Sequence, residues 1–352
     1  MSLKLSTLTP LHIGNGEKYT SAEFVVRGDK IIRIDTNKIF TLLDEKNQEK
    51  FIQELEDPHF QIENFIKGIP LSEIKIYSAR LKGGIPTEIQ EQIKTGGSAY
   101  IPGSSIKGTM RTAILYNQIN DKNMGELSKI FDMKYWQRER EIQMFVDEFL
   151  SGAGIPTYSS LLKFLQVADS EPASNLCVYT VKPLEGERSG WGWFKRGGNE
   201  VVTHHEMISA GEELECALRT NYDANIYRDL KLSEKERYID VRELKRCTYE
   251  FSRDLIEHEI EFAGRYHIGF LSEFYSDLRQ KNKEDAPVMK LGQGSGFMAT
   301  TIGLKLKKRP ELLEKVKRSL RGKTYPYEFP KTRKIIVEEE VPLGWVKLRF
   351  VE

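Results

Sequence analysis

Small residues and two cations between Gly103 and Arg111 form a pattern that could bind phosphate. Gly103 and Gly108 have the spacing of a nucleotide-binding P-loop, but Thr109 and Met110 follow where such a loop has Lys and then Ser or Thr. The pattern therefore argues against a P-loop NTPase. What remains is a helix start with small residues and free N–H groups, and this suits a phosphodiester as well as a nucleotide.

The helix expected after this segment presents its cations on one face. Ser104 or Ser105 is predicted to cap it, because either hydroxyl can accept a free backbone N–H. Lys107 and Arg111 lie near the positive end of the helix dipole, where a cation gains nothing, so we expect an anion there. Apolar residues at helical spacing predict a separate, core-facing stripe: Ile106, Met110, Ala113 and Ile114.

A second glycine cluster lies at residues 292–296. Gly292, Gly294 and Gly296 lack the spacing and the following acid of a dinucleotide-binding fingerprint. They form either a flexible turn or a backbone that a ligand can approach closely. Lys290 and Phe297 flank the cluster and favour the second alternative, since glycines with a cation and a ring are typical of grooves for single-stranded nucleic acid.

Catalytic and metal-binding patterns are sparse. His12 lies in a turn with Gly14 and Gly16, and it is the histidine we consider for acid–base cleavage of RNA; a histidine in a turn also serves as a hydrogen-bonding or phosphate-contacting residue. His204 and His205 are adjacent and cannot both face one ion from a regular helix or strand. We therefore assign no catalytic residue, no metal and no cofactor.

Residues 186–200 are predicted to form a loop rich in glycine, aromatic residues and cations. The stretch from Trp191 to Arg196 could stack on the bases of single-stranded RNA. It could equally pack against a neighbouring subunit, where Trp and Arg are enriched. The sequence leaves both alternatives open.

Charge is unevenly distributed along the chain. The whole sequence has 53 Lys and Arg and 52 Asp and Glu, a net charge of +1. Residues 286–352 contain fifteen cations and seven carboxylates, whereas residues 1–285 contain thirty-eight and forty-five, and residues 92–120 contain no carboxylate. This asymmetry indicates either a polyanion bound to part of the molecule or a solvated basic tail.

Composition bounds the class of protein. A chain of 352 residues with 39% hydrophobic and 30% charged residues predicts about two domains, or one core with large insertions. Because it has no long apolar stretch, we expect a cytoplasmic protein without a membrane partner. Three widely spaced cysteines predict reduced, buried thiols: Cys177, Cys216 and Cys247.

Strand and helix patterns follow one another without the alternation of a Rossmann fold, and this order predicts an α+β fold. The strands are expected at residues 3–8, 23–27, 30–35, 164–168, 176–181, 213–219 and 344–350. The helices are expected at residues 36–67, 106–116, 126–150, 234–263 and 309–321.

Three segments, in this order, resemble the hallmark segments of CRISPR-associated RAMP proteins. The first is residues 9–16 (TPLHIGNG), the second is residues 101–111 (IPGSSIKGTMR), and the third is the glycine cluster at 292–296. The third segment, together with the sequence Pro342-Leu343-Gly344-Trp345, most resembles the Csm-type RAMP subunits of type III-A effectors.

This resemblance implies a ferredoxin-like (RRM-like) core with helical insertions and a C-terminal lobe. We divide the chain into a core at 1–220, a charged helical segment at 221–285 and a basic C-terminal lobe at 286–352. The insertions in the core are residues 36–67, 126–150 and 186–200.

The resemblance also implies a place in a ribonucleoprotein. Such a subunit caps the backbone filament at the 3′ end of the crRNA, touches a neighbouring backbone RAMP subunit and supports 3′ maturation of the crRNA. An external maturation nuclease is a further candidate partner. The RNA contacts carried over by position are His12, Gly14, Gly16, Ser104, Ser105, Lys107, Arg111, Lys290, Gly292, Gly294 and Gly296.

We therefore predict a non-catalytic crRNA-binding subunit of a type III-A effector. One alternative is a metal-independent RAMP endoribonuclease that processes CRISPR transcripts with His12. The other alternative is a protein-binding scaffold that makes no direct contact with RNA.

Overall fold

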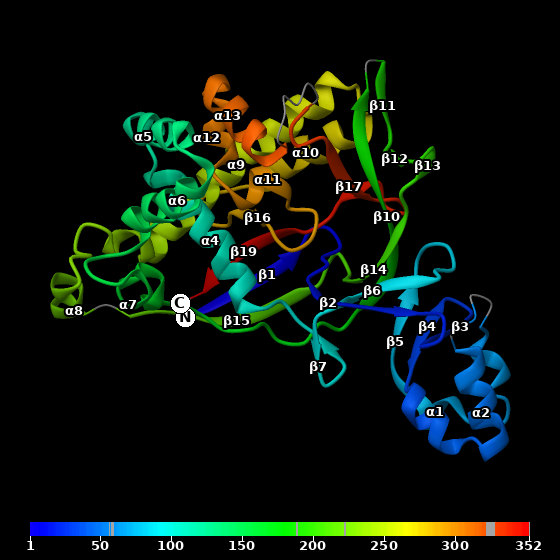
Figure 1. Cartoon of the computed structure of the whole chain (residues 1–352). Helices are drawn as coiled ribbons and strands as arrows, with labels where there is room; N and C mark the ends of the chain where they lie inside the picture. Colours follow the sequence, from blue (N-terminus) through cyan, green and yellow to red (C-terminus); the bar gives the residue numbers. More distant parts are fainter. Residues whose placement is uncertain (56, 58–59, 188, 222, 322–327, 352) are drawn as a thin grey trace.

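The computed structural model describes residues 1–55, 57, 60–187, 189–221, 223–321 and 328–351. Two main sheets organise these residues, and most of the helices gather over one of them (Figure 1). The helices α1 (Thr36–Leu42) and α2 (Glu45–Glu54) lie at the opposite end of the molecule.

The first sheet has five strands in the order β16–β19–β1–β15–β9, and all neighbours are antiparallel. Its central strand alternates as predicted, with Leu3, Leu5 and Thr7 buried. The strands are β1 (Ser2–Thr7), β9 (Leu165–Val167), β15 (Glu213–Thr220), β16 (Val288–Lys290) and β19 (Trp345–Val351).

Two long helices connect the strands of this sheet. Helix α4 (Gly103–Gln118) lies between β1 and β9, and α9 (Val241–Arg265) lies between β15 and β16. They pack against each other, and their apolar faces share one core with the sheet. The succession β1–α4–β9–β15–α9–β19, with the spatial order β19–β1–β15–β9, is the split βαβ arrangement of a ferredoxin-like domain. The predicted α+β, ferredoxin-like core is confirmed.

The second sheet has ten strands. Seven follow one path in the order β2–β6–β14–β10–β5–β4–β3, while β11, β17 and β18 attach beside it. Their bounds are β2 (Gly14–Thr20), β3 (Phe24–Arg27), β4 (Lys30–Ile34), β5 (Lys75–Leu81), β6 (Glu88–Gln92), β10 (Leu176–Glu187), β11 (Gly190–Trp193), β14 (Thr203–Ile208), β17 (Thr332–Ile336) and β18 (Val341–Pro342). Two short hairpins, β7 (Lys94–Thr95) with β8 (Ser98–Ala99) and β12 (Lys195–Arg196) with β13 (Asn199–Glu200), stand apart.

A small helical unit extends from β3, β4 and β5. It comprises α1 (Thr36–Leu42), α2 (Glu45–Glu54), the 3-10 helix η1 (Ile62–Asn64) and α3 (Leu71–Ile74). Asp35 and Asp44 cap the first two helices by accepting the backbone N–H groups of Lys38 and Asn47. The unit has a core of its own around Phe51. The helical prediction for 36–67 thus resolves into short pieces, and residues 56, 58 and 59 of that range lie outside the described residues.

The remaining helices lie over the first sheet or beside it. The predicted helix at 126–150 is two helices, because the chain is extended at Met133 and Lys134. The bounds are α5 (Asp121–Asp132), α6 (Tyr135–Leu150), α7 (Pro156–Ser159), η2 (Leu161–Phe164), α8 (Ala224–Asp229), η3 (Glu236–Ile239), α10 (Gly269–Lys281), α11 (Gly296–Thr300), α12 (Gly303–Lys307) and α13 (Pro310–Arg321).

Most of the described residues in 186–200 form strands, so the loop predicted there is wrong. Strand β10 continues to Glu187, and β11 folds back along it, with Trp193 opposite Leu184. The ring of Trp191 lies 5.6 Å from that of Phe270, and the ammonium of Lys182 lies 5.5 Å from the centre of the Trp193 ring. These rings therefore pack within the chain. Arg188 lies outside the described residues.

The basic segment 286–352 contributes strands to both sheets, β16 and β19 to the first and β17 and β18 to the second. Its separation as a C-terminal lobe, and the boundaries at 220 and 285, stay predictions. Six of its cations form ion pairs with carboxylates of residues 1–285: Lys307–Glu261, Lys308–Asp254, Arg309–Asp121, Lys315–Asp132, Lys331–Glu185 and Arg333–Glu259. Much of the charge asymmetry is therefore balanced inside the molecule.

Two further predictions concern the interior and the membrane. Cys177, Cys216 and Cys247 are buried and free, as predicted. Within the described ranges, none of the helices combines the length and the apolar character that a bilayer crossing requires.

Candidate nucleic-acid interface

The first and third hallmark segments are in direct contact. The backbone N–H of Gln293 donates to the carbonyl oxygen of His12 at 2.8 Å. Gly292 has a φ of +68°, and a Cβ atom at this position would lie 2.2 Å from the same oxygen. Only glycine fits here, because both the positive φ and the close approach exclude a side chain. The glycine cluster is thus a closely packed turn and not a flexible one.

The second hallmark segment begins helix α4, but its serines do not cap it. The helix begins at Gly103 after Pro102, and the Gly103 N–H donates to a carboxylate oxygen of Asp169 at 2.8 Å. A Cβ at Gly103 would lie 2.2 Å from the carbonyl oxygen of Val167, so this position also requires glycine. The predicted serine cap is therefore wrong, because a carboxylate from a distant part of the sequence already occupies the helix start.

Ser104 is exposed and Ser105 is half-buried in the first turn of α4. Neither is needed for capping, so both remain candidate contacts. Gly14 and Gly16 are exposed at the start of β2. Nothing lies within 4 Å of a Cβ placed at Gly16, so the protein surface beside it is open.

The second hallmark segment lies beside the helix that begins at the end of the third. Helix α11, which begins at Gly296, contacts α4. Arg111, Phe297 and Thr300 line the same cavity, whose volume is about 290 Å³. All three hallmark segments are thereby brought together.

Three half-buried cations at this place have no carboxylate partner among the residues that the structure describes. They are Lys107 and Arg111 on α4 and Lys334 on β17. Burial alone lowers the pKa values of Lys107 and Lys334, with no compensating carboxylate. Such partly desolvated cations are stabilised by an incoming anion.

Lys334 was not predicted from the sequence. Its Cβ lies 3.6 Å from the position of a Cβ on Gly294, so it borders the glycine cluster. Along β17 the side chains alternate: Arg333 is buried on one face beside Glu259, while Lys334 lies on the other face. The sequence Lys331-Thr332-Arg333-Lys334, three cations in four residues, is the pattern that could have revealed it.

Lys290 does not belong to the surface. Its side chain is buried with its ammonium 5.4 Å from the centre of the Trp345 ring. Burial lowers the pKa of Lys290 to about 8, although Glu259 opposes this shift. We therefore remove Lys290 from the candidate contacts, because a buried ammonium cannot reach a phosphate outside.

His12 is also buried, with 3% of its surface exposed. Its Nδ1 lies 2.6 Å from the carbonyl oxygen of Glu206, so Nδ1 carries the proton and donates. Burial lowers the pKa of His12 to about 4, and that of His205, whose ring centre lies 4.8 Å away, to about 2. A general acid–base residue in RNA cleavage has a pKa nearer the working pH. The environment of His12 is that of a residue that holds the turn in place.

The carboxylate of Glu206 is the centre of a buried hydrogen-bond network beneath this turn. It is fully buried and accepts the hydroxyls of Tyr19 and Tyr77 at 2.6 and 2.7 Å. It also accepts the backbone N–H of Gln92 at 3.1 Å and pairs with Lys94. Gln92 links this hydrogen-bond network to the first hallmark segment, because its side-chain oxygen accepts the N–H of Ile13 there.

A family model of the RAMP superfamily matches residues 4–293. The chain belongs to the RAMP superfamily. The matched residues contain the first two hallmark segments and reach the start of the third.

Two relatives share similar sequences with this RAMP chain. A Methanocaldococcus jannaschii protein named CRISPR system Cms protein Csm5 is 24% identical over 396 residues, covering 100% of the chain and 89% of the relative. A Streptococcus thermophilus protein of the same name is 28% identical over 329 residues, covering 85% and 79%.

Two solved structures share the fold of the RAMP chain. A chain in the cryo-EM structure of a Csm–crRNA–target RNA ternary complex of a type III-A CRISPR-Cas system matches with a TM-score of 0.72 and 25% identity, covering 99% of this chain and 100% of that one. The crystal structure of T. onnurineus Csm5 matches with a TM-score of 0.64 and 23% identity, covering 97% and 99%. The second likeness concerns the fold alone.

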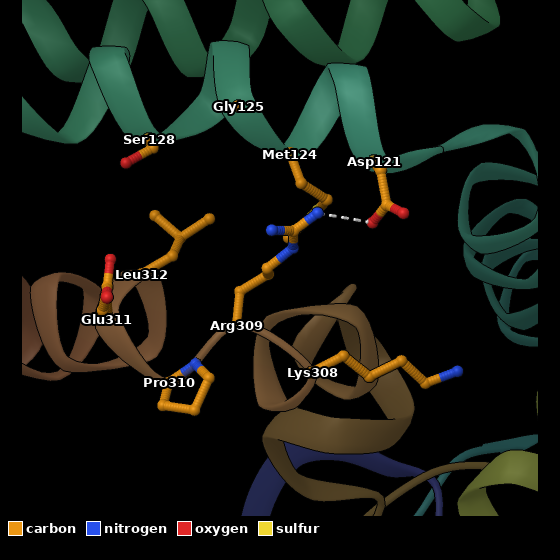
Figure 2. A pocket seen from close by; sticks show the side chains of 9 residues that line it. All are labelled: Asp121, Met124, Gly125, Ser128, Lys308, Arg309, Pro310, Glu311 and Leu312. Carbon is orange, nitrogen blue, oxygen red and sulfur yellow. Dashed lines mark hydrogen bonds and ion pairs between the residues drawn. The ribbon is translucent and has the colours of Figure 1, made fainter.

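A larger cleft in this RAMP protein, of about 480 Å³, lies between α5 and the junction of α12 and α13. Figure 2 shows Arg309 directed across it to Asp121, with which it forms an ion pair at 2.9 Å. Lys308, on the same wall, is within 3.7 Å of Asp254. Because its cations already have carboxylate partners, this cleft fits an anion less well than the surface at Lys107, Arg111 and Lys334.

The described part of this RAMP protein contains no cluster of side chains that could ligate a metal ion. Across those residues, His, Cys, Asp and Glu side chains nowhere form a group of three or more that could hold an ion. The candidate interface offers a ligand positive charge and closely packed glycine backbone.

Proposed function

We propose that this chain is the non-catalytic crRNA-binding subunit of a type III-A effector ribonucleoprotein and caps the backbone filament at the 3′ end of the crRNA. The observation that carries the proposal is the convergence of the three hallmark segments around Lys107, Arg111 and Lys334, none of which has a carboxylate partner in the described structure. The likeness to a whole chain of a Csm–crRNA–target RNA complex supports it.

RNA binding at this surface is electrostatic and largely independent of sequence. The three cations neutralise phosphates, and the release of condensed counterions drives association. The fitted backbone at Gly292 and Gly294 allows the strand to approach closely. Such phosphate contacts fix the register of the strand without reading its bases. This is what a subunit that must hold many different guide sequences needs.

The partners follow from the same proposal. A neighbouring backbone RAMP subunit and other subunits of the effector pack on surfaces away from the three cations. Support of crRNA 3′ maturation, with an external nuclease as the acting enzyme, belongs to the proposal because the buried environment of His12 is unsuited to cleavage.

Substitution of Arg111 tests the RNA contact. Arg111→Ala should weaken binding of unrelated single-stranded RNAs by roughly fivefold at 0.1 M salt and reduce the slope of log K against log salt by about 0.7. Arg309→Ala is the matched control, because Arg309 is already paired with Asp121. Full affinity and an unchanged slope in Arg111→Ala would contradict the proposal.

Two further experiments address the alternatives. Specific cleavage of repeat RNA in EDTA that is lost in His12→Ala would establish the endoribonuclease. Absence of crosslinks to crRNA within the assembled complex would establish the scaffold. Photoreactive nucleotides near the two ends of the crRNA test the position, since we expect crosslinks from the 3′ part only.

A further inference from the structure

Behind Arg111 lies a cavity whose lining is almost entirely apolar. Its volume is about 290 Å³, and its walls come from α4, α5, α6, the segment 297–306 and α13. Three of the lining residues are aromatic: Phe131, Phe145 and Phe297. A flat apolar ring in this cavity would contact aromatic side chains on more than one side.

The lining contains a single charged residue. Arg111 lines the cavity and has no ion pair within the described ranges, while Thr300 is exposed beside it. An apolar space with one unpaired cation fits a group that is itself apolar and carries a negative charge nearby. A nucleotide has this construction, since its base is a flat ring and its phosphate is anionic.

The cavity shares Arg111 with the proposed RNA surface. Phe297 directly follows Gly296 of the third hallmark segment, and Arg111 belongs to the second. We propose that the cavity receives one base of the bound RNA strand, turned out of the strand's own stack, while the phosphate of that nucleotide lies on Arg111. This inference rests on the proposed RNA binding and adds the site of one base to it.

The polar groups of the lining indicate how the base is held. The hydroxyls of Thr300 and Thr301 donate to the carbonyl oxygens of Gly296 and Phe297 at 2.9 and 2.6 Å. Their hydrogens are therefore in use, and the cavity recognises a base by shape and stacking more than by hydrogen-bond donors. Stacking on aromatic side chains is tolerant of base identity, because every base has a π-face.

A protein side chain is the competing occupant. An apolar residue of a neighbouring subunit could fill the cavity, but a purely apolar group would leave Arg111 desolvated and unpaired, which is costly. The nucleotide satisfies both the apolar space and the cation with one ligand. The experiment distinguishes the two occupants.

The test uses the full chain and a set of single-stranded RNAs of the shortest length that binds, so that the strand has one register, each with one abasic nucleotide at a different position. Affinity is measured by fluorescence anisotropy. For the wild-type protein, one position should lower affinity by roughly five- to a hundredfold, which is the range for loss of one stacked base. The other positions should have little effect.

Thr300→Trp places a large ring in the cavity from an exposed lining position, so the fold is expected to tolerate it. This variant should bind intact RNA more weakly, by the same factor as the sensitive abasic position, and should no longer respond to that position. Thr41→Trp, an exposed threonine on α1, is the control and should behave as the wild type.

The outcomes separate the two proposals. If the wild-type protein does not bind intact RNA, the proposed function fails. If it binds but no abasic position stands out, or if Thr300→Trp keeps full sensitivity, the base site is overturned and the proposed function stands. If Thr300→Trp instead impairs only assembly with a neighbouring subunit, the occupant is a protein side chain and the base site is equally overturned.

Discussion

Gly292 lies against the carbonyl oxygen of His12, at a point where a Cβ atom would lie 2.2 Å from that oxygen. The two residues belong to hallmark segments at distant places in the sequence. The adjacent N–H of Gln293 donates to the same oxygen, so the contact is both a hydrogen bond and a steric fit. The shape of the candidate interface depends on this fit.

Gly292→Ala should therefore lower the free energy of unfolding by about 2–4 kcal/mol, since it adds both backbone strain and overlap. Gly296→Ala is the matched control: φ is +70° there too, but nothing lies within 4 Å of the new Cβ. The control should lose only about 1 kcal/mol. Urea denaturation measures both values, and equal losses would show that the fit to His12 is unimportant.

Lys334→Met should separate stability from RNA binding. Burial lowers the pKa of Lys334 without a compensating carboxylate, so the charged form is penalised in the folded protein. The variant should be as stable as the wild type or more stable, yet bind RNA roughly fivefold more weakly and with a smaller salt slope. Lys315→Met, which removes an ion pair with Asp132, should show unchanged RNA binding. Unchanged RNA affinity in Lys334→Met would contradict its role.

Acid should destabilise the protein through His12. Its pKa is about 4 in the folded state against a usual 6.5, and burial is the main cause, with Lys334 and Lys94 adding to it. Between these values the unfolded chain binds more protons, so the free energy of unfolding falls as the pH falls from 6.5. The loss attributable to His12 should be about 2 kcal/mol at pH 4.5.

His12→Asn tests this pH dependence, because the asparagine amide can still donate to the Glu206 carbonyl in place of Nδ1. The variant should lose about 2 kcal/mol less than the wild type between pH 6.5 and 4.5. Chemical denaturation at the two pH values gives the comparison. Parallel losses in the two proteins would exclude His12 as the source.

Glu206→Gln should expose the cost of removing a buried carboxylate under the first hallmark segment. Lys94, whose side chain is 6% exposed, loses this partner and keeps only the partly exposed Glu91 at 3.2 Å. We expect a loss of about 2–3 kcal/mol, below the roughly 3–5 kcal/mol of a fully unpaired buried charge. Lys94→Met in the same chain should recover part of it, since both charges are then absent. Strict additivity of the two substitutions would rule out the coupling.

Local patterns in the sequence were sufficient for several elements. The strands predicted at 23–27 and 30–35 form the hairpin of β3 and β4, in which Arg27 pairs with Lys30 across the two residues between them. The stripe on α4 was predicted from helical spacing, and its four residues, Ile106, Met110, Ala113 and Ile114, are buried. These outcomes depend on neighbours in the chain, which the sequence displays.

Other features depend on residues that are far away in the sequence. Asp169 replaces the predicted serine cap, and no pattern near Gly103 could indicate it. Lys290 and Lys334 lie in one basic segment, yet the first is buried beside Trp345 and the second borders the glycine cluster. Strand register decides which side of a sheet a cation faces, and register was not derivable here.

The distribution of charge also depends on contacts between residues that are far apart in the sequence. The sequence left open a bound polyanion or a solvated tail, but carboxylates of residues 1–285 pair with six cations of the basic segment. The cations relevant to an anion are three half-buried ones at the hallmark segments that have no such carboxylate partner in the described structure: Lys107, Arg111 and Lys334. Counting charges could not identify them.

The pairing of β1 with β19 has a consequence for synthesis on the ribosome. The N–H of Trp345, at the start of β19, donates to Thr9, 336 positions earlier. At ordinary translation rates, β1 waits about 20–70 s for this neighbour. Nascent chains stalled before Trp345 should therefore be cleaved by protease within β1, and the hallmark segments should close into one surface only after the last strand emerges.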